Sequence, residues 1–374
     1  MGSRKKSSGA SQALIDFRRE VPVRACSMRV VNWAALVAGV SLSACGWAWA
    51  EAPMAQAPRT ITVALDGSGD FTSVQEAMDS AKIGDTVFLK PGEYPQSVTI
   101  HSKEKVKLVG AGRDLVVLLG RGDVVGALHV GKWPYGASDI EISEMTINDR
   151  GGHALGIFNS RGITLRHLRV KGMVFSQQVR NVRIEDCTIG DSETTGVQFA
   201  DSQAVLVGNF IHDNDHGVNV AGKSEVRLEH NIITRSLFEA VVVNDRANVI
   251  LISNTLVRNG GGAAFLGSSQ SEVSGNVVSL NKVGFIFGGA GQAKTSFNAL
   301  YNGEANYMRA ELPNVPAPEL QSMSDLIADP RFVDVEHDDF RLRPDTTLLN
   351  KGEFLYLGAL PPLAQSFSGN DHKK

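Results

Sequence analysis

The chain lacks the features that would tie it to a disulfide framework or to a nucleic acid. It has 3 cysteines in 374 residues, too few for the paired pattern of disulfide-rich secreted domains. Its formal net charge of −3 gives no reason to expect a nucleic acid as partner. What it does have is 43% hydrophobic residues, enough for a sizeable core, and 38 glycines, which favour a fold with many turns.

The long apolar run near the N-terminus is too short to span a bilayer. It extends from 33 to 44, follows the basic Arg29, and precedes Ala48-Trp49-Ala50 and then Glu51. This is the pattern of a signal peptide with an A-x-A cleavage site. A transmembrane anchor would need roughly 20 apolar residues. The sequence therefore predicts no membrane span, and an exported protein that begins at Glu51 after cleavage.

A second interpretation of the same segment is lipidation. Leu42-Ser43-Ala44-Cys45 resembles a bacterial lipobox, in which Cys45 would carry lipid. The predicted location is thus secreted or periplasmic, with an envelope lipoprotein as the alternative. We divide the chain into a disordered extension or mis-assigned start (1–27), a signal peptide (28–50), a linker (51–59), one repeat domain (60–361) and a polar tail (362–374).

A repeat of about 22 residues runs through the centre of the chain. Its reference positions, spaced by 22, 22, 23, 22 and 22 residues, are Cys187, Asn209, Asn231, Asn254, Asn276 and Asn298. Short apolar-x-apolar strands lie between them, and strands of this length are stable only when they stack in parallel around a shared core. Helical and leucine-rich solenoids need helices or a leucine pattern that the repeat lacks. The sequence therefore predicts an all-β, single-stranded parallel β-helix, with a short N-terminal capping helix at 72–81.

The repeated asparagines have a structural explanation. Stacked at one turn, they would tolerate a left-handed backbone and bond amide to amide as a ladder. Cys187 occupies the same column, so we expect a small buried filler and not a nucleophile.

Several segments resemble known β-helix proteins. Residues 62–78 resemble the opening of pectin methylesterases and other pectin-lyase-like proteins, and 108–118 resemble their next coil. Residues 328–334, 339–342 and 357–359 resemble the C-terminal signature of bacterial right-handed β-helix repeat proteins. The resemblance implies a right-handed β-helix of the pectin- and pectate-lyase-like superfamily. It implies no single activity, because that superfamily includes lyases, hydrolases, esterases, epimerases and proteins with no known catalysis.

The catalytic motifs of two of these families are missing. Residues 284–288 faintly resemble the motif that holds an aspartate in pectin methylesterases, but Gly284 stands where the acid would be. The Asn-Thr-Asp, Asp-Asp, Gly-His-Gly and Arg-x-Lys motifs of polygalacturonases are absent. If the chain is an enzyme, a polysaccharide lyase or C5-epimerase is therefore favoured over an esterase or glycoside hydrolase.

The densest titratable cluster lies four residues after the reference positions, at Asp191, Asp213, Arg235 and Arg258. Nearby in sequence are His212, Asp215, His216, Glu193 and Glu239. We predict Asp213, His216 and Arg235 as catalytic: Arg235 would hold a uronate carboxylate while His216 takes the adjacent proton. Asp191 and Arg258 would contact substrate. The alternatives are a solvated charge network at exposed turns, or oxygen ligands for Ca²⁺ from the stacked aspartates.

A second candidate surface is the outward residue of each short strand. We assign this row to Gly156, Val174, Gln198, Asn219, Val242, Phe265 and Ile286. Gln198 and Asn219 would bind sugar, with Phe265 as an apolar surface beneath it. Alternatively, the irregular segment after Asn298 folds back and covers the row.

Two functions fit these features. The first is an exported protein that binds an acidic, uronate-containing polysaccharide and processes it by proton abstraction. The second is a non-catalytic β-helix that binds glycan or forms a scaffold at the cell surface. The sequence indicates no oligomeric state.

Overall fold

A computed structural model of the chain describes residues 57–122, 126–313 and 315–364, and the structural statements below concern these residues. The expected signal peptide, the lipobox cysteine Cys45 and residues 1–27 lie outside them. In the described part, no helix is both long enough and apolar enough to cross a membrane.

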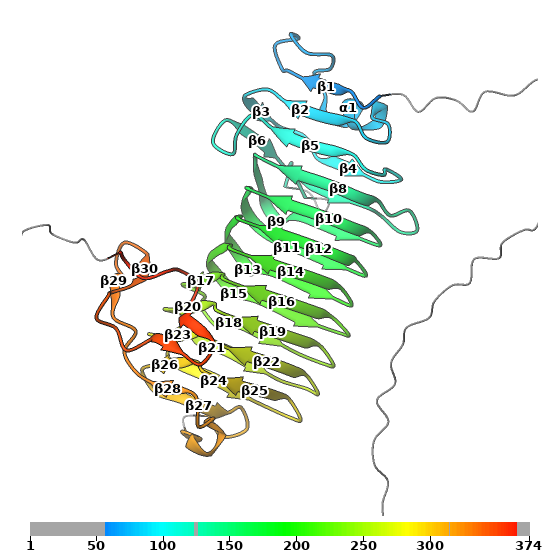
Figure 1. Cartoon of the computed structure of the whole chain (residues 1–374). Helices are drawn as coiled ribbons and strands as arrows, with labels where there is room; N and C mark the ends of the chain where they lie inside the picture. The colour runs from blue at the N-terminus through cyan, green and yellow to red at the C-terminus, as the bar shows by residue number, and fades with distance from the viewer. Residues whose placement is uncertain (1–56, 123–125, 314, 365–374) are drawn as a thin grey trace, which may run out of the picture. The chain divides into compact units, whose positions relative to one another are not determined.

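The chain winds into stacked coils whose strands pair in parallel (Figure 1). One face is an 11-stranded sheet, named sheet A here. Its strands, in spatial order, are β1 (Thr60–Val63), β2 (Thr86–Leu89), β5 (Lys107–Gly110), β8 (Ser138–Ser143), β10 (Arg161–Arg166), β12 (Arg180–Glu185), β14 (Gln203–Val207), β16 (Glu225–Glu229), β19 (Asn248–Ile252), β22 (Gln270–Ser274) and β25 (Gln292–Ser296).

A second sheet forms the other two faces of the coils, which we call the first arm and the second arm. After leaving sheet A, each central coil crosses the first arm, turns, and crosses the second arm. The first arm contains β3 (Gly92–Tyr94), β6 (Val116–Leu119), β17 (Ile232–Thr234), β20 (Thr255–Val257), β23 (Val277–Ser279), β26 (Ala299–Tyr301) and β28 (Leu326–Ile327). The second arm contains β4 (Val98–Ile100), β7 (Leu128–Val130), β18 (Glu239–Val243), β21 (Gly261–Phe265), β24 (Val283–Phe287) and β27 (Ala305–Arg309). Four long strands bend through both arms: β9 (Thr146–Phe158), β11 (Arg169–Gln177), β13 (Thr188–Ala200) and β15 (Phe210–Ala221). The predicted parallel β-helix is confirmed.

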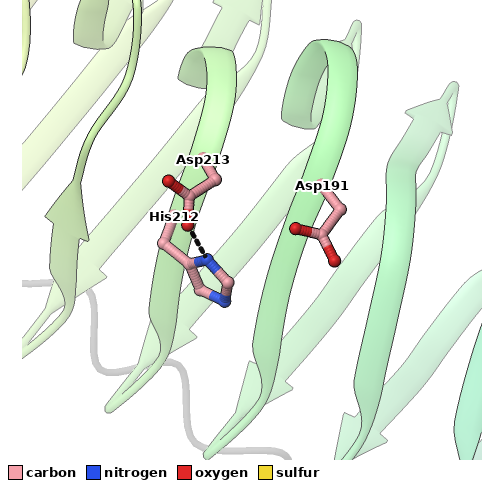
Figure 2. Close-up of side chains that lie close together, drawn as sticks. All are labelled: Asp191, His212 and Asp213. Atoms are coloured by element: carbon pink, nitrogen blue, oxygen red, sulfur yellow. Dashed lines mark hydrogen bonds and ion pairs between the residues drawn. The ribbon is translucent and has the colours of Figure 1, made fainter.

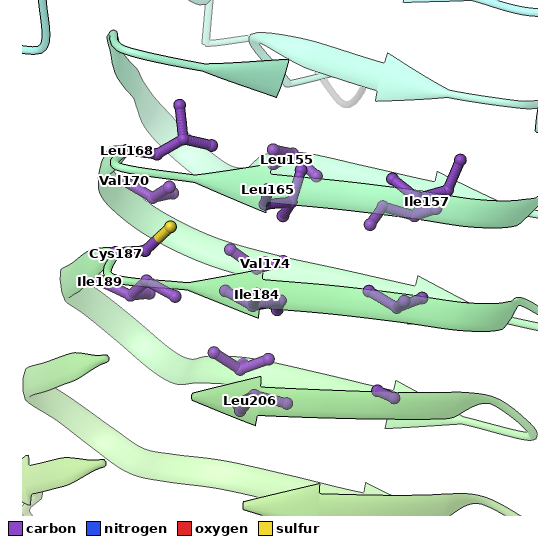
Figure 3. Packing of buried hydrophobic residues seen from close by; sticks show 14 of the residues in the cluster. Leu155, Ile157, Leu165, Leu168, Val170, Val174, Ile184, Cys187, Ile189 and Leu206 are labelled. Carbon is purple, nitrogen blue, oxygen red and sulfur yellow. The ribbon is translucent and has the colours of Figure 1, made fainter. Parts of the chain in front are cut away.

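The core is the space that the three faces enclose, and Figure 3 shows its side chains stacked coil on coil. Val197, Val218 and Val241 pair in register across successive strands of the second arm and are fully buried. Cys187 lies in this core, as its column predicts. Burial raises the pKa of its thiol to about 12, so the sulfur stays protonated and unreactive near neutral pH.

The asparagine ladder forms at the turn between sheet A and the first arm. The side-chain Oδ1 of Asn254 accepts from the backbone N–H of Asn231 at 2.9 Å and from its Nδ2 at 3.0 Å. Asn254 in turn donates to Asn276, and the same pattern repeats from Asn209 to Asn298. The predicted left-handed position was wrong by one residue. The positive φ angles belong to the preceding residues, which are Asp186, Gly208, His230, Ser253, Gly275 and Phe297.

Both ends of the described solenoid carry additional structure. Helix α1 (Val74–Ser80) begins after Ser73, whose hydroxyl accepts from the N–H of Glu76, and it buries Val74, Ala77 and Met78. The helix lies within the expected range of 72–81.

After η1 (Pro318–Leu320), the chain returns along the solenoid as two hairpins, β29 (Phe332–Asp334) with β30 (Asp339–Leu342) and β31 (Leu349–Lys351) with β32 (Phe354–Tyr356). We call residues 328–361 the return segment. Its apolar residues pack on the outer side of the first arm, against Val257, Val277 and Ala299.

Candidate functional site

The predicted column of charged residues lies at the turn between the two arms. Asp191, Asp213, Arg235 and Arg258 occupy equivalent positions in successive coils, each with a positive φ of 60°, 52°, 55° and 59° respectively. The left-handed turn backbone directs these side chains away from the core, and they are partly or largely exposed.

The two arginines of this column hold the return segment. The Arg235 guanidinium donates to both oxygens of Asp213, at 2.9 and 3.1 Å, and to Asp338 at 2.6 Å. Arg258 donates to the carbonyl oxygen of Val335 at 3.0 Å. Burial alone would raise the pKa of Asp213, but hydrogen bonds from Arg235 and His212 outweigh it and hold that pKa below its ordinary value. Arg235 therefore neutralises two protein carboxylates in this structure.

The cluster of Asp191, His212 and Asp213 is the candidate cation site, shown in Figure 2, with one potential ligand atom from each residue within 4.8 Å of the others. His212 Nδ1 lies 2.6 Å from Asp213 Oδ2, and Asp191 lies 3.8 Å from Lys171 Nζ. Ca²⁺ requires six to eight oxygen ligands. Here one ligand is a nitrogen, and both oxygens of Asp213 already accept from Arg235. The set fits a charge network better than a Ca²⁺ site.

His216 contacts Glu239, whereas the repeat spacing grouped it with Asp213 and Arg235. Its Nδ1 lies 3.2 Å from Glu239 Oε2, an ion-pair distance, but the buried Nδ1 makes no hydrogen bond of good geometry within the described residues. The ring stacks on Phe238 with centroids 5.1 Å apart and planes at 27°. The contact with His216 lowers the pKa of Glu239, so the carboxylate stays ionised beside the imidazole. His216 pairs in register with Thr195 at the start of the second arm. The sequence predicted that Glu239 lies near the charged cluster, but it did not predict that Glu239 pairs with His216.

The outward row of the second arm differs from the predicted row at two positions. Register places Phe175 between Gly156 and Gln198, and Ala264 between Val242 and Ile286. Phe265 is 0% exposed and pairs with the interior Val243 and Phe287, so it is no sugar-binding surface. Val174 is likewise interior. A slip of one residue reverses the face of a strand, and adjacent alanines at 263 and 264 make both registers look alike in the sequence.

Gln198 and Asn219 lie side by side on the outer face, as predicted. Within the described residues, Asn219 Oδ1 has no hydrogen-bond partner. At the C-terminal end of the row, Val242, Ala264 and Ile286 are buried. Part of the irregular segment after Asn298 lies beside this end of the row, because Met308 pairs with Ile286 and Pro316 pairs with Met308. The apolar residues of the return segment pack on the first arm instead.

Four rings gather on the N-terminal half of the same outer face, and the sequence pattern missed them. Phe158 lies 5.4 Å from His129 and 5.6 Å from Phe175, and His153 lies 5.6 Å from Phe175, measured between ring centroids. We call these four residues the ring cluster. Gly156 makes room for it, since a Cβ there would lie 2.6 Å from the Phe158 ring. The rings come from coils upstream of the regular 22-residue repeat.

Comparisons with known proteins agree with this fold. Residues 135–300 match the family model described as "Right handed beta helix region". A stretch of 65 residues is 42% identical to the probable pectinesterase 56 of Arabidopsis thaliana; it covers 16% of this chain and 23% of the length of that relative.

One solved structure has the same fold. The A-module of the mannuronan C-5 epimerase AlgE4 of Azotobacter vinelandii superposes with a TM-score of 0.50 at 17% identity, covering 65% of this chain and 88% of that one. The pectate lyase Pel9A gives a TM-score of 0.44 at 13% identity, covering 82% and 96%. By its stacked parallel coils and its matched central region, the chain has the right-handed parallel β-helix fold.

Proposed function

We propose that this chain is exported, binds a uronate-containing polysaccharide on the outer face of the second arm, and processes it by proton abstraction. One observation carries the proposal: an imidazole–carboxylate pair, His216 and Glu239, lies on the same arm as the amides of Gln198 and Asn219. Polar side chains on a rigid sheet can orient a sugar for such a reaction.

The pair suits a general base. An ionised Glu239 at ion-pair distance stabilises the imidazolium that forms when the His216 ring accepts a proton. In a uronate, the proton next to the carboxylate is the acidic one. Its removal leads to elimination in a lyase, or to return of a proton from the opposite face in an epimerase. The amides of Gln198 and Asn219 would donate to sugar hydroxyls or to the carboxylate.

The part assigned to Arg235 stays a prediction. Its guanidinium contacts Asp213 and Asp338, so a substrate carboxylate would have to compete with both. Asp191 and Arg258 likewise remain proposed substrate contacts, although Arg258 contacts the return segment. The AlgE4 A-module, which has the same fold, is a mannuronan C-5 epimerase, an enzyme of the proposed class.

The test is turnover of a panel of uronic-acid polymers in D₂O. Absorbance of unsaturated products reports elimination, and deuterium at the carbon next to the carboxylate reports exchange or epimerisation. His216→Ala and Glu239→Gln should each lower the rate by roughly a hundredfold or more, the usual range for loss of a general base. Arg235→Ala should also abolish turnover if that residue neutralises the substrate carboxylate. His230→Ala is the matched control, because His230 is exposed on the neighbouring turn.

Full activity of the His216 and Glu239 variants would exclude this base. If wild-type protein turns over no polymer but still binds one, the second function takes its place, a non-catalytic glycan-binding or scaffold protein. Gly284, in place of the acid of pectin methylesterases, favours that alternative.

A further inference from the structure

A cleft of about 580 Å³ lies away from the His216–Glu239 pair, beside the turns that lead from the second arm into sheet A. Its lining includes Trp133, Pro134, Arg161, Gln178 and Arg180. Arg161 follows Phe158 of the ring cluster by three residues. The cleft is therefore built from the same coils as the outer face proposed to bind polysaccharide.

Two arginines stand next to each other in this cleft. Arg161 opens β10 and Arg180 opens β12, and the two residues are register partners on adjacent strands. Both are exposed, and within the described residues neither side chain has a hydrogen bond or ion pair. Other arginines of these strands are paired: Arg166 and Arg183 both contact Glu185. Neighbouring like charges on a sheet are destabilising, so an unpaired Arg–Arg pair is not explained by stability.

The other side chains of the cleft add to its positive charge. Its ionisable lining consists of three cationic groups and one carboxylate, on a chain whose net charge is negative. The carboxylate, Glu104, lies 3.2 Å from Lys105. Lys103 donates to two backbone carbonyls at 2.7 and 2.8 Å, which leaves the two arginines as the groups available to an anion.

An exposed aromatic surface borders the arginines. Trp133 is 79% exposed and the neighbouring Tyr135 is 61% exposed. Large aromatic side chains held out in solvent beside a cleft are typical of binding surfaces. The flat indole offers a stacking surface for the C–H face of a sugar ring, and guanidinium groups bind carboxylates through paired hydrogen bonds.

We propose that this cleft binds an acidic sugar residue, with its carboxylate on Arg161 and Arg180 and its ring on Trp133. The site would hold one unit of the polymer while another lies on the second arm. The choice of a uronate rests on the proposed function, but the cleft uses none of the residues that would carry out the reaction.

Binding is tested by titrating purified protein with oligogalacturonate, its methyl-esterified form and inorganic phosphate. Trp133 is itself a probe, since the other tryptophans are Trp33, Trp47 and Trp49, all before the expected start at Glu51. We expect oligogalacturonate to change the Trp133 fluorescence. The Arg161→Gln/Arg180→Gln double variant should bind it at least about tenfold more weakly, because two charge-assisted contacts are lost. The ester should bind wild-type protein about as weakly as the acid binds the double variant.

Arg183→Gln is the matched control, an exposed arginine on the same strand as Arg180 but already paired with Glu185. It should bind like wild type. The double variant should melt no lower than wild type, because it removes a like-charge pair. A binding role predicts loss of affinity without loss of stability, whereas a structural role predicts the reverse.

Two results would overturn this inference. One is a double variant that binds oligogalacturonate as tightly as wild type. The other is inorganic phosphate competing as well as galacturonate while Trp133→Ala leaves the affinity for oligogalacturonate, measured by calorimetry, unchanged. The two proposals fail separately: His216→Ala should keep the fluorescence change, and full turnover in that variant would exclude the base without affecting the cleft.

Discussion

Single residues repeat their contacts from coil to coil, and this made several of them predictable. The spacing of the asparagines indicated a ladder, because one hydrogen-bonding pattern recurs only where the chain returns to the same place every 22 residues. A second ladder, which the sequence spacing did not indicate, passes through Asn259, Asn281 and Asn302 at the turn between the arms. Ser236 interrupts that column, so its period is less visible.

Replacing Asn254 with leucine should lower the free energy of unfolding by about 1–3 kcal/mol. The side chain is fully buried, and its loss leaves two donors of Asn231 without their acceptor. It also removes the Nδ2 donor to the Leu228 carbonyl and to Asn276, whose Oδ1 keeps the backbone N–H of residue 254. Urea unfolding followed by circular dichroism measures the change. Asn248→Leu, on the exposed side of sheet A in the same coil, is the control. Equal stability of the Asn254 variant and wild type would show that water satisfies the ladder equally well.

Cys187 should resist thiol reagents at pH 8 in the folded protein and react once the protein unfolds. Its raised pKa keeps the thiol protonated, and its side chain is buried. The folded-state pKa exceeds the unfolded one, roughly 8.5, so this group's contribution to stability is fully present below that pH and declines as the pH rises above it. From Glu51 onward it is the sole cysteine. Rapid labelling under native conditions would contradict the buried position.

For the elements, the positions of the strands could be predicted from the sequence, but the register in which they pair could be predicted only in part. The short strands of the repeat occur where the apolar alternation places them, but a register shift between Lys171 and Val174 displaces the outward row. The ring cluster depends on that row, so its members were not identifiable from spacing alone. The return segment also required the structure, because Asp338 is 103 residues from Arg235 in sequence.

Arg235→Ala should loosen the return segment. The change removes contacts to Asp213 and Asp338, and partly exposed ion pairs of this kind contribute up to about 1 kcal/mol. Hydrogen exchange should speed up in 328–361 and stay unchanged in the central coils. Arg331→Ala, which breaks an exposed pair with Asp345 inside the segment, should have less effect. Unchanged exchange in the Arg235 variant would mean that apolar packing alone holds the segment.

Acid should weaken the same contact. The pKa of Asp213 is lower in the folded state than in the unfolded state, so its contribution to stability is present above the unfolded value, roughly 3.9. It is lost as the pH falls through the lowered folded value. Asp213→Asn should therefore flatten the acid side of the stability profile, measured as melting temperature against pH. A profile as steep as that of wild type would assign the acid sensitivity to other carboxylates.

For the whole molecule, the 22-residue repeat predicted the fold. It does not predict the cellular location, which depends on the N-terminal segment, or the activity, which depends on individual surface side chains. Intact-mass measurement of native protein should give a chain that begins at Glu51, or at Cys45 with lipid attached. Recovery of the full-length chain from the cytoplasm would contradict both forms of export.

The return segment also limits how the chain can change in length. Its contacts reach several specific coils: Asp338 binds Arg235, the N–H of Ala359 donates to Thr255, and the N–H of Gly358 donates to Gly275. An inserted coil would preserve the ladder but move everything beyond it by about 4.8 Å. A coil inserted upstream of Phe210 does not change the spacing of Arg235, Thr255 and Gly275, so the return segment can still contact all three. A coil inserted between Arg235 and Gly275 increases that spacing, so the segment can no longer reach all of them. The segment thus fixes the number of coils beneath it, and we expect duplication of whole repeats to be tolerated only on the N-terminal side.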